Sequence, residues 1–69
     1  MLTVIVLTIE ETRAEYSCSS SRELEVFAKL LESSAYCKKF KVVDSDNGIV
    51  SDLKRFGVDN YGKFTTDFN

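Results

Sequence analysis

A single amphipathic helix is encoded by the stretch SCSSSRELEVFAKLLESSAY, residues 17–36, and this helix decides the fold. Ser20 is a favourable N-cap residue, and Glu23 follows it at the spacing of a capping box. Apolar residues recur at the i, i+3, i+4 and i+7 positions of one helix face, namely Leu24, Phe27, Ala28, Leu31 and Ala35. The stretch therefore predicts a helix from residue 21 to residue 35 with one apolar stripe.

The segment LTVIVLTI, residues 2–9, precedes the helix and has the composition of a strand. It is apolar on both faces: Leu2, Val4 and Val6 lie on one side, and Ile5, Leu7 and Ile9 lie on the other. A strand that is apolar on both sides is typical of a sheet interior. We therefore expect this strand to have a neighbour on each edge.

A second strand is predicted for RAEYSC, residues 13–18, where apolar and charged residues alternate. Ala14, Tyr16 and Cys18 share one face of this strand. The polar residues 10–12 separate it from the first strand, so the two form a hairpin.

The segment after the helix predicts a second hairpin, with a strand over residues 38–44 and a turn at Asn47-Gly48. That turn pairs Asp46 with Ile49 and Val42 with Leu53. An alternative is a short helix over residues 51–57, capped by Ser51 and stopped by Gly57. The aspartates near the turn do not have EF-hand spacing, so we expect no metal site.

The 69 residues predict one small α+β domain, in which an antiparallel sheet carries one helix on one face in the order ββαββ. The segment from residue 57 to residue 69 is predicted to be an irregular tail. It contains the aromatic residues Tyr61, Phe64 and Phe68. The tail either covers one end of the sheet or docks elsewhere.

Composition excludes several chemistries. The chain has no histidine and three glycines, so it lacks Ser-His and Cys-His pairs and glycine-rich phosphate loops. We expect neither enzymatic activity nor a cofactor. The apolar start is too short for a signal peptide or a membrane span, which predicts a cytoplasmic protein. Cys18 and Cys37 are expected to be reduced in that compartment, and a disulfide between them is the alternative.

A binding role follows from the two apolar faces of the first strand. One helix cannot cover both faces of the sheet, and if it covers Ile5 and Leu7, the opposite face needs cover from the tail or from another chain. Val26 and Leu30 also lie outside the apolar stripe of the helix. We therefore predict contact with another protein or a second copy of the chain. The expected contact residues are Val26, Leu30, Leu2, Val4, Val6, Tyr61, Phe64 and Phe68.

The alternative function is binding of single-stranded nucleic acid. Lysines that contact phosphates beside aromatic rings that stack on bases form such a surface. The candidate residues are Lys38, Lys39, Lys41, Lys54, Tyr36 and Phe56. Lysines on an exposed strand also prevent edge-to-edge aggregation, which is the structural explanation for the same pattern.

The order of hairpin, helix and strand is similar to that of small phage-encoded proteins that bind and inhibit a host enzyme. The resemblance is one of architecture and size, and no motif matches residue by residue. It implies a modulator or inhibitor that acts by binding a protein, without assigning a role to any residue here.

Overall fold

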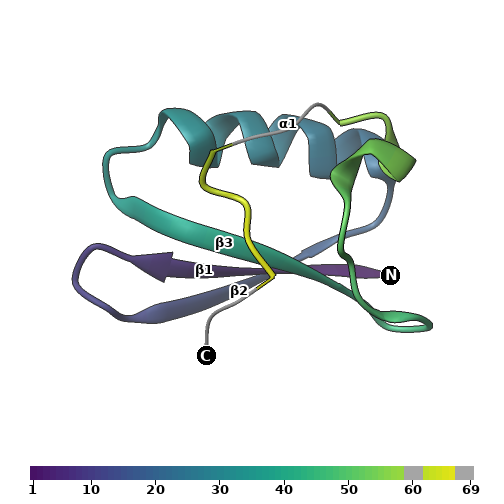
Figure 1. Ribbon diagram of the computed structural model, residues 1–69, viewed down its shortest axis with the longest axis horizontal. Coiled ribbons are helices and arrows are strands. Elements are labelled where there is room, and N and C mark those ends of the chain that lie inside the picture. Colours follow the sequence, from purple (N-terminus) through teal and green to yellow (C-terminus); the bar gives the residue numbers. More distant parts are fainter. Residues whose placement is uncertain (59–61, 67–69) are drawn as a thin grey trace.

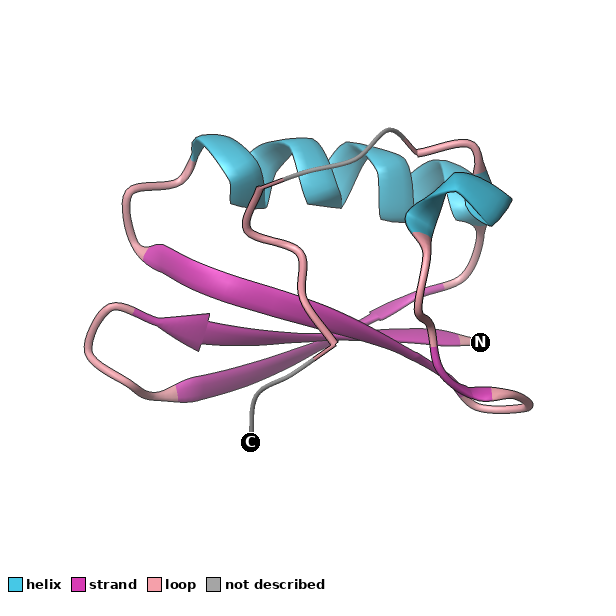
Figure 2. Cartoon of the chain, in the orientation of Figure 1, coloured by secondary structure: helices cyan, strands magenta, loops and turns pink. Residues whose placement is uncertain are grey.

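A four-stranded antiparallel sheet carries helix α1 on one face (Figures 1 and 2). The computed structural model describes residues 1–58 and 62–66. Its elements are β1 (Leu2–Thr8), β2 (Arg13–Cys18), α1 (Ser21–Ser33), β3 (Cys37–Asp44), β4 (Gly48–Ile49) and the 3-10 helix η1 (Leu53–Phe56). The strand order is β2-β1-β3-β4. The predicted α+β class, with one helix on an antiparallel sheet, is confirmed.

Strand β1 lies inside the sheet, as its composition predicts. It pairs antiparallel with β2 on one edge and with β3 on the other. Val4, for example, lies opposite Tyr16 of β2 and opposite Val42 of β3. Directly opposed residues point to the same face, so these three side chains belong to the same side of the sheet.

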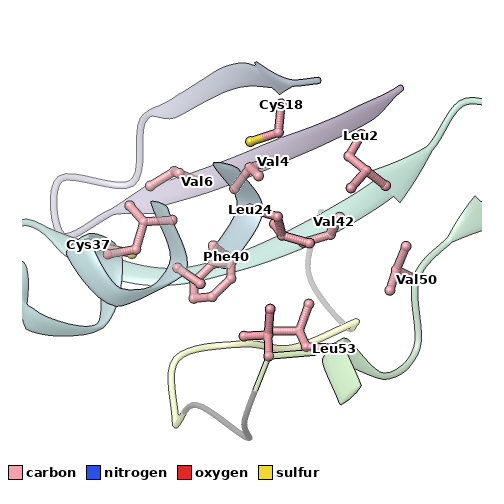
Figure 3. Packing of buried hydrophobic residues seen from close by; sticks show 13 residues of the cluster. Leu2, Val4, Val6, Cys18, Leu24, Cys37, Phe40, Val42, Val50 and Leu53 are labelled. Atoms are coloured by element: carbon pink, nitrogen blue, oxygen red, sulfur yellow. The ribbon is translucent and has the colours of Figure 1, made fainter. Parts of the chain in front are cut away.

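Helix α1 covers the face that bears Leu2, Val4 and Val6, whereas the predicted binding surface places it over Ile5 and Leu7. The first three side chains are 7%, 0% and 5% exposed. They belong to the core and are not available as surface contacts, so that part of the predicted binding surface is wrong. Figure 3 shows them beside Leu24 of α1 and Phe40 of β3.

The N-terminus of α1 has the predicted cap. The Ser20 hydroxyl accepts a hydrogen bond from the Glu23 N–H at 3.2 Å. The Glu23 carboxylate accepts from the N–H and hydroxyl of Ser19, at 2.7 and 2.8 Å, instead of from the Ser20 backbone. These two bonds favour the ionised carboxylate and lower the pKa of Glu23. The helix ends at Ser33, two residues earlier than predicted, so Ala35 is exposed beyond it.

The β1–β2 hairpin contains a residue in the left-handed backbone region. Glu11 has φ +64°, and its N–H donates to the Thr8 carbonyl at 2.8 Å. The Thr8 N–H donates to the Thr12 carbonyl at 2.9 Å and closes the loop. Glycine usually occupies such a position because a Cβ atom is disfavoured there. The Glu11 carboxylate lies 3.6 Å from the Lys38 ammonium at an exposed site, which contributes little.

Glu11→Gly is therefore expected to raise the free energy of unfolding, by about 0.5–1 kcal/mol, because it removes backbone strain. Urea denaturation at pH 7 measures the change. Glu11→Ala is the matched control, since it removes the same carboxylate and leaves the strain in place. An equal gain from Ala and Gly would show that the charge matters and the dihedral angle does not.

The second hairpin differs from the prediction in its register. Asp44 pairs with Gly48, and Val43 pairs with Ile49, so three residues form the loop instead of two. The Asp44 carboxylate accepts from the Asp46 N–H at 2.9 Å, which fixes this loop and lowers the pKa of Asp44. Ile49 consequently faces away from the core and is exposed.

Residues after β4 form η1, as in the alternative prediction of a short helix. The cap is Asp52 and not the predicted Ser51: the Asp52 carboxylate accepts from the Lys54 N–H at 2.9 Å. Gly57 ends it at φ +77°, and its N–H donates to the Lys54 carbonyl. The predicted strand pairing of Val42 with Leu53 is therefore wrong. Leu53 is nevertheless buried, because η1 packs beside α1 on the same side of the sheet (Figure 1).

Residues 62–66 return to the β3 edge that β4 occupies at Val43 and Asp44, and they pair beside Phe40, beyond the end of β4. The Phe40 N–H donates to the Lys63 carbonyl at 3.0 Å, and the Thr65 N–H donates to the Phe40 carbonyl at 2.9 Å. The rings of Phe40 and Phe64 lie 5.7 Å apart, so Phe64 packs on the core. The Lys63 ammonium donates to the Ser34 carbonyl just beyond α1, at 2.5 Å. Tyr61 and Phe68 lie outside the described residues.

Candidate protein-binding surface

An apolar groove lies between α1 and the edge strand β2. It has a volume of about 320 Å³, and its walls include Val6, Ala14, Tyr16, Phe27, Leu31 and Tyr36. We call this hollow the α1–β2 groove. It exists because small Ala14 leaves space on the helix side of β2, while Phe27 reaches from α1 toward the sheet edge.

The Tyr16 and Phe27 rings form the central contact along the groove. Their centroids lie 5.0 Å apart with an interplanar angle of 64°, an edge-to-face arrangement. A second hollow of about 270 Å³ lies along the same pair, toward Cys18 and Glu23. Alternate residues of an extended chain point to the same side. Two hollows along one strand edge can therefore take two alternate side chains.

Two exposed apolar residues lie on α1 outside its buried stripe, and Leu30 is the one next to the groove. Val26 and Leu30 are 51% and 60% exposed. Leu30 follows Phe27 by three residues, so it lies next to Phe27 on the helix surface. Tyr16, across the groove, is also exposed. Of the predicted contact residues, Val26 and Leu30 are exposed. Tyr16 and Phe27 line the groove but are not among the predicted contacts.

The outer edge of β2 has backbone groups that β1 does not use. Among residues 1–58 and 62–66, β2 is the first strand in the sheet order, and β1 is the strand that pairs with it. The hydrogen bond from Thr8 to Thr12 begins the alternation of bonded and non-bonded pairs along this hairpin. Counting from it, the N–H and C=O groups of Arg13, Glu15 and Ser17 point away from β1. Such an edge is a template for another strand.

The opposite face of the sheet has an apolar centre flanked by charged residues. We call it the open sheet face, and no helix or strand among residues 1–58 and 62–66 covers it (Figure 2). Ile5 lies between Glu15 and Lys41, and Leu7 lies between Arg13 and Lys39. Long charged side chains can cover apolar neighbours with their alkyl stems. Ile5 and Leu7 are accordingly half-buried.

The residues of the nucleic-acid alternative do not form one surface. Lys39 and Lys41 both lie on the open sheet face, whereas Lys54 lies on η1. Phe56 packs against the core, and the Tyr36 hydroxyl donates to the Glu10 carboxylate at 2.6 Å, which raises the pKa of Tyr36. Lys38 lies beside Glu11. The predicted combination of lysines with stacking aromatics on one strand surface is therefore wrong.

Both cysteines are free, buried thiols. Burial raises the pKa of Cys18, and the nearby negative charge of Glu23 raises it further. Burial also raises the pKa of Cys37, against a smaller opposite effect of Lys63. A high pKa keeps a thiol protonated and weakly nucleophilic. The two cysteines therefore act as small apolar core residues.

Within the described part of the chain, no three acidic, cysteine or histidine side chains lie together as a metal-binding group. The helices among these residues are also too short or too polar to cross a bilayer.

Comparisons with models of known protein families, with characterised proteins and with solved structures give no significant match. Any functional assignment must therefore come from the surface itself. The sequence pattern places Phe27 in the core stripe of the helix and gives no binding role to Tyr16, yet both residues line the groove. The missing information was the strand order, because a residue on β2 borders a groove only when β2 is at the edge of the sheet.

Proposed function

We propose that this chain is a non-enzymatic protein-binding domain, and that it binds an extended segment of protein along the outer edge of β2. The observation that carries this proposal is the position of the α1–β2 groove directly beside a strand edge with outward backbone groups. Backbone pairing supplies affinity in strand addition, and pockets for alternate side chains supply specificity. The outer edge of β2 would supply the backbone pairing, and the α1–β2 groove would supply the pockets.

The chemistry of the groove supports a protein partner. Its centre is an aromatic pair, and exposed Leu30 follows Phe27 of that pair by one helical turn. Aromatic residues are enriched in protein interfaces, and residues in the centre of an interface dominate affinity. Charged groups lie at the margins, where Glu23 borders the second hollow.

The experiment is affinity capture from the source cells with the chain as bait, followed by titration of the purified captured protein. Val26→Asp/Leu30→Asp is expected to weaken that affinity by about tenfold or more, because two charges replace apolar contacts. Tyr16→Ser is expected to act in the same direction. Circular dichroism verifies that each variant is folded, as expected for exposed positions.

Arg22→Asp/Lys29→Asp is the control, because it also adds two aspartates to exposed positions of α1 and makes the net charge more negative by twice as much. It is expected to leave the affinity within about threefold of the wild type. If Val26→Asp/Leu30→Asp and Tyr16→Ser bind as tightly as the wild type, the α1–β2 groove is not the binding surface.

A further inference from the structure

The two hollows along the edge of β2 differ in their chemistry. The described residues that line the α1–β2 groove carry no charge, whereas the Glu23 carboxylate borders the second hollow. We propose that the segment bound along β2 carries a lysine or arginine and, two residues later in its own sequence, an aromatic or large aliphatic residue. The inference rests on the proposed function, and it names the side chains that the two hollows select.

The α1–β2 groove has the size and the walls for an apolar side chain. An apolar cavity of about 150 Å³ holds a benzene ring, and the groove has a volume of about 320 Å³. Its Tyr16 and Phe27 rings offer edges and faces to a third ring. At its hairpin end, the hydroxyls of Thr8 and Thr12 hydrogen-bond to each other at 2.7 Å. A charged side chain would lose hydration there without gaining a partner.

The second hollow has a fixed negative charge. The Oε1 atom of Glu23 accepts from the N–H and hydroxyl of Ser19, at 2.7 and 2.8 Å, and these bonds hold the carboxylate in place. Both bonds end on Oε1, so the lone pairs of Oε2 remain for a ligand. The other described residues of the lining are uncharged. A lysine or arginine would therefore form a charge-assisted hydrogen bond with a group that is already ordered.

The spacing of the hollows matches alternate residues of an extended chain. Tyr16 and Phe27 line both hollows, the groove continues toward Ala14, and the second hollow continues toward Cys18. Ala14, Tyr16 and Cys18 follow one another at two-residue steps on one face of β2. Alternate residues of a strand lie about 6.7 Å apart. The two bound side chains therefore come from positions two residues apart.

The direction of the bound segment follows from the sheet. Along β2, the chain passes the groove at Ala14 before it reaches the second hollow at Cys18. The strand pairs β1–β2, β1–β3 and β3–β4 are all antiparallel. Antiparallel pairing is also slightly more stable per residue than parallel pairing. A segment that pairs antiparallel with the outward backbone groups of Glu15 and Ser17 meets the second hollow first, so the basic residue precedes the apolar one.

Four capped peptides test composition and order together. The reference peptide is Thr-Val-Lys-Thr-Phe-Thr-Val. The other three replace its Lys by Glu, replace its Phe by Ser, or exchange Lys and Phe. Fluorescence anisotropy of labelled peptides, with the chain at up to about 1 mM, measures the affinities. Each of the three altered peptides is expected to bind at least about fivefold more weakly than the reference.

Glu23→Gln tests the charge on the chain itself. Its amide oxygen can still accept from Ser19, so the contact at the helix start is kept. This variant is expected to bind the Lys and Glu peptides within about twofold of one another. Glu25→Gln is the matched control, because it removes the same charge from the other flank of α1. Glu25 precedes Glu32 by two helical turns, and Glu32 accepts from the Lys63 N–H at 3.1 Å on that flank. The control is expected to keep the preference for Lys.

The inference is overturned by equal affinity for the Lys and Glu peptides, or for the two orders of Lys and Phe. A preference for Lys that persists in Glu23→Gln overturns it as well, and so does a wild type that binds none of the peptides at about 1 mM. If the four peptides bind alike and Tyr16→Ser abolishes their binding, the proposed function stands without this selectivity. If Tyr16→Ser leaves peptide binding unchanged, the peptides bind elsewhere, and the proposed function fails together with the inference.

Discussion

Val4→Asp is expected to leave the chain unfolded at 25 °C. Val4 is 0% exposed at the centre of the sheet, between Tyr16 and Val42. The substitution removes an apolar contact worth about 1.5–3 kcal/mol and buries a carboxylate, which costs several kcal/mol more. The whole domain has a stability of about 3–10 kcal/mol at its length. The cost is therefore comparable to the entire free energy of folding.

Ile5→Asp is the matched comparison, because the same charge enters the same strand one residue later. Ile5 lies on the open sheet face and is half-buried, opposite Lys41 and Glu15. Its expected cost is about 1–2 kcal/mol, so this variant stays folded. Far-UV circular dichroism and urea denaturation measure both. If Ile5→Asp unfolds the chain and Val4→Asp does not, α1 covers the other face of the sheet.

Phe40→Ala is expected to destabilise the fold by about 3–5 kcal/mol, the cost of a large cavity in a core. The Phe40 side chain is 0% exposed and is the largest fully buried one in the core. It also holds the returning segment, since it lies 5.7 Å from Phe64 by ring centroids. Thermal and urea unfolding measure the loss. Amide hydrogen exchange at Thr65, whose N–H donates to the Phe40 carbonyl, is expected to accelerate.

Phe64→Ala separates the two roles of Phe40, which fills the core and also contacts the returning segment. Phe64 is half-buried, so its loss is expected to cost less than that of Phe40, about 1–2 kcal/mol. Exchange at Thr65 should accelerate in this variant too. If Phe40→Ala costs no more than Phe64→Ala, Phe40 is not the centre of the core.

Local interactions make much of the fold predictable. The helix start follows from Ser20 and Glu23, and both residues make capping contacts in the structure. The first two strands follow from residue alternation over short stretches. The end of the second hairpin is harder to predict, because Val50 and Leu53 suit a strand or a short helix equally. Two local signals in the sequence favour the short helix: Asp52 caps its start and Gly57 ends it. They decide that this segment forms η1.

Predicting which face of the sheet α1 covers requires non-local information. β1 is apolar on both sides, so its own pattern cannot select one. Its neighbours can: Val4 and Val6 lie opposite Tyr16 and Ala14, whereas Ile5 and Leu7 lie opposite Glu15 and Arg13. Combining the two strands in register indicates the buried face. The α1–β2 groove is harder still to predict from the sequence, because it depends on which strand lies at the edge of the sheet.

The central position of β1 has a consequence for synthesis on the ribosome. Its partner β2 follows at once, but its second partner β3 ends at Asp44, 26 residues after β2 ends at Cys18. At an elongation rate of about 5–20 residues per second, one side of β1 waits about one to five seconds for that partner. During this interval the N–H and C=O groups of Thr3, Ile5 and Leu7, which pair with β3 in the finished sheet, have no strand partner in the nascent hairpin. Early formation of α1 would cover the apolar face of this hairpin before the sheet is complete, while the β1 edge waits for β3.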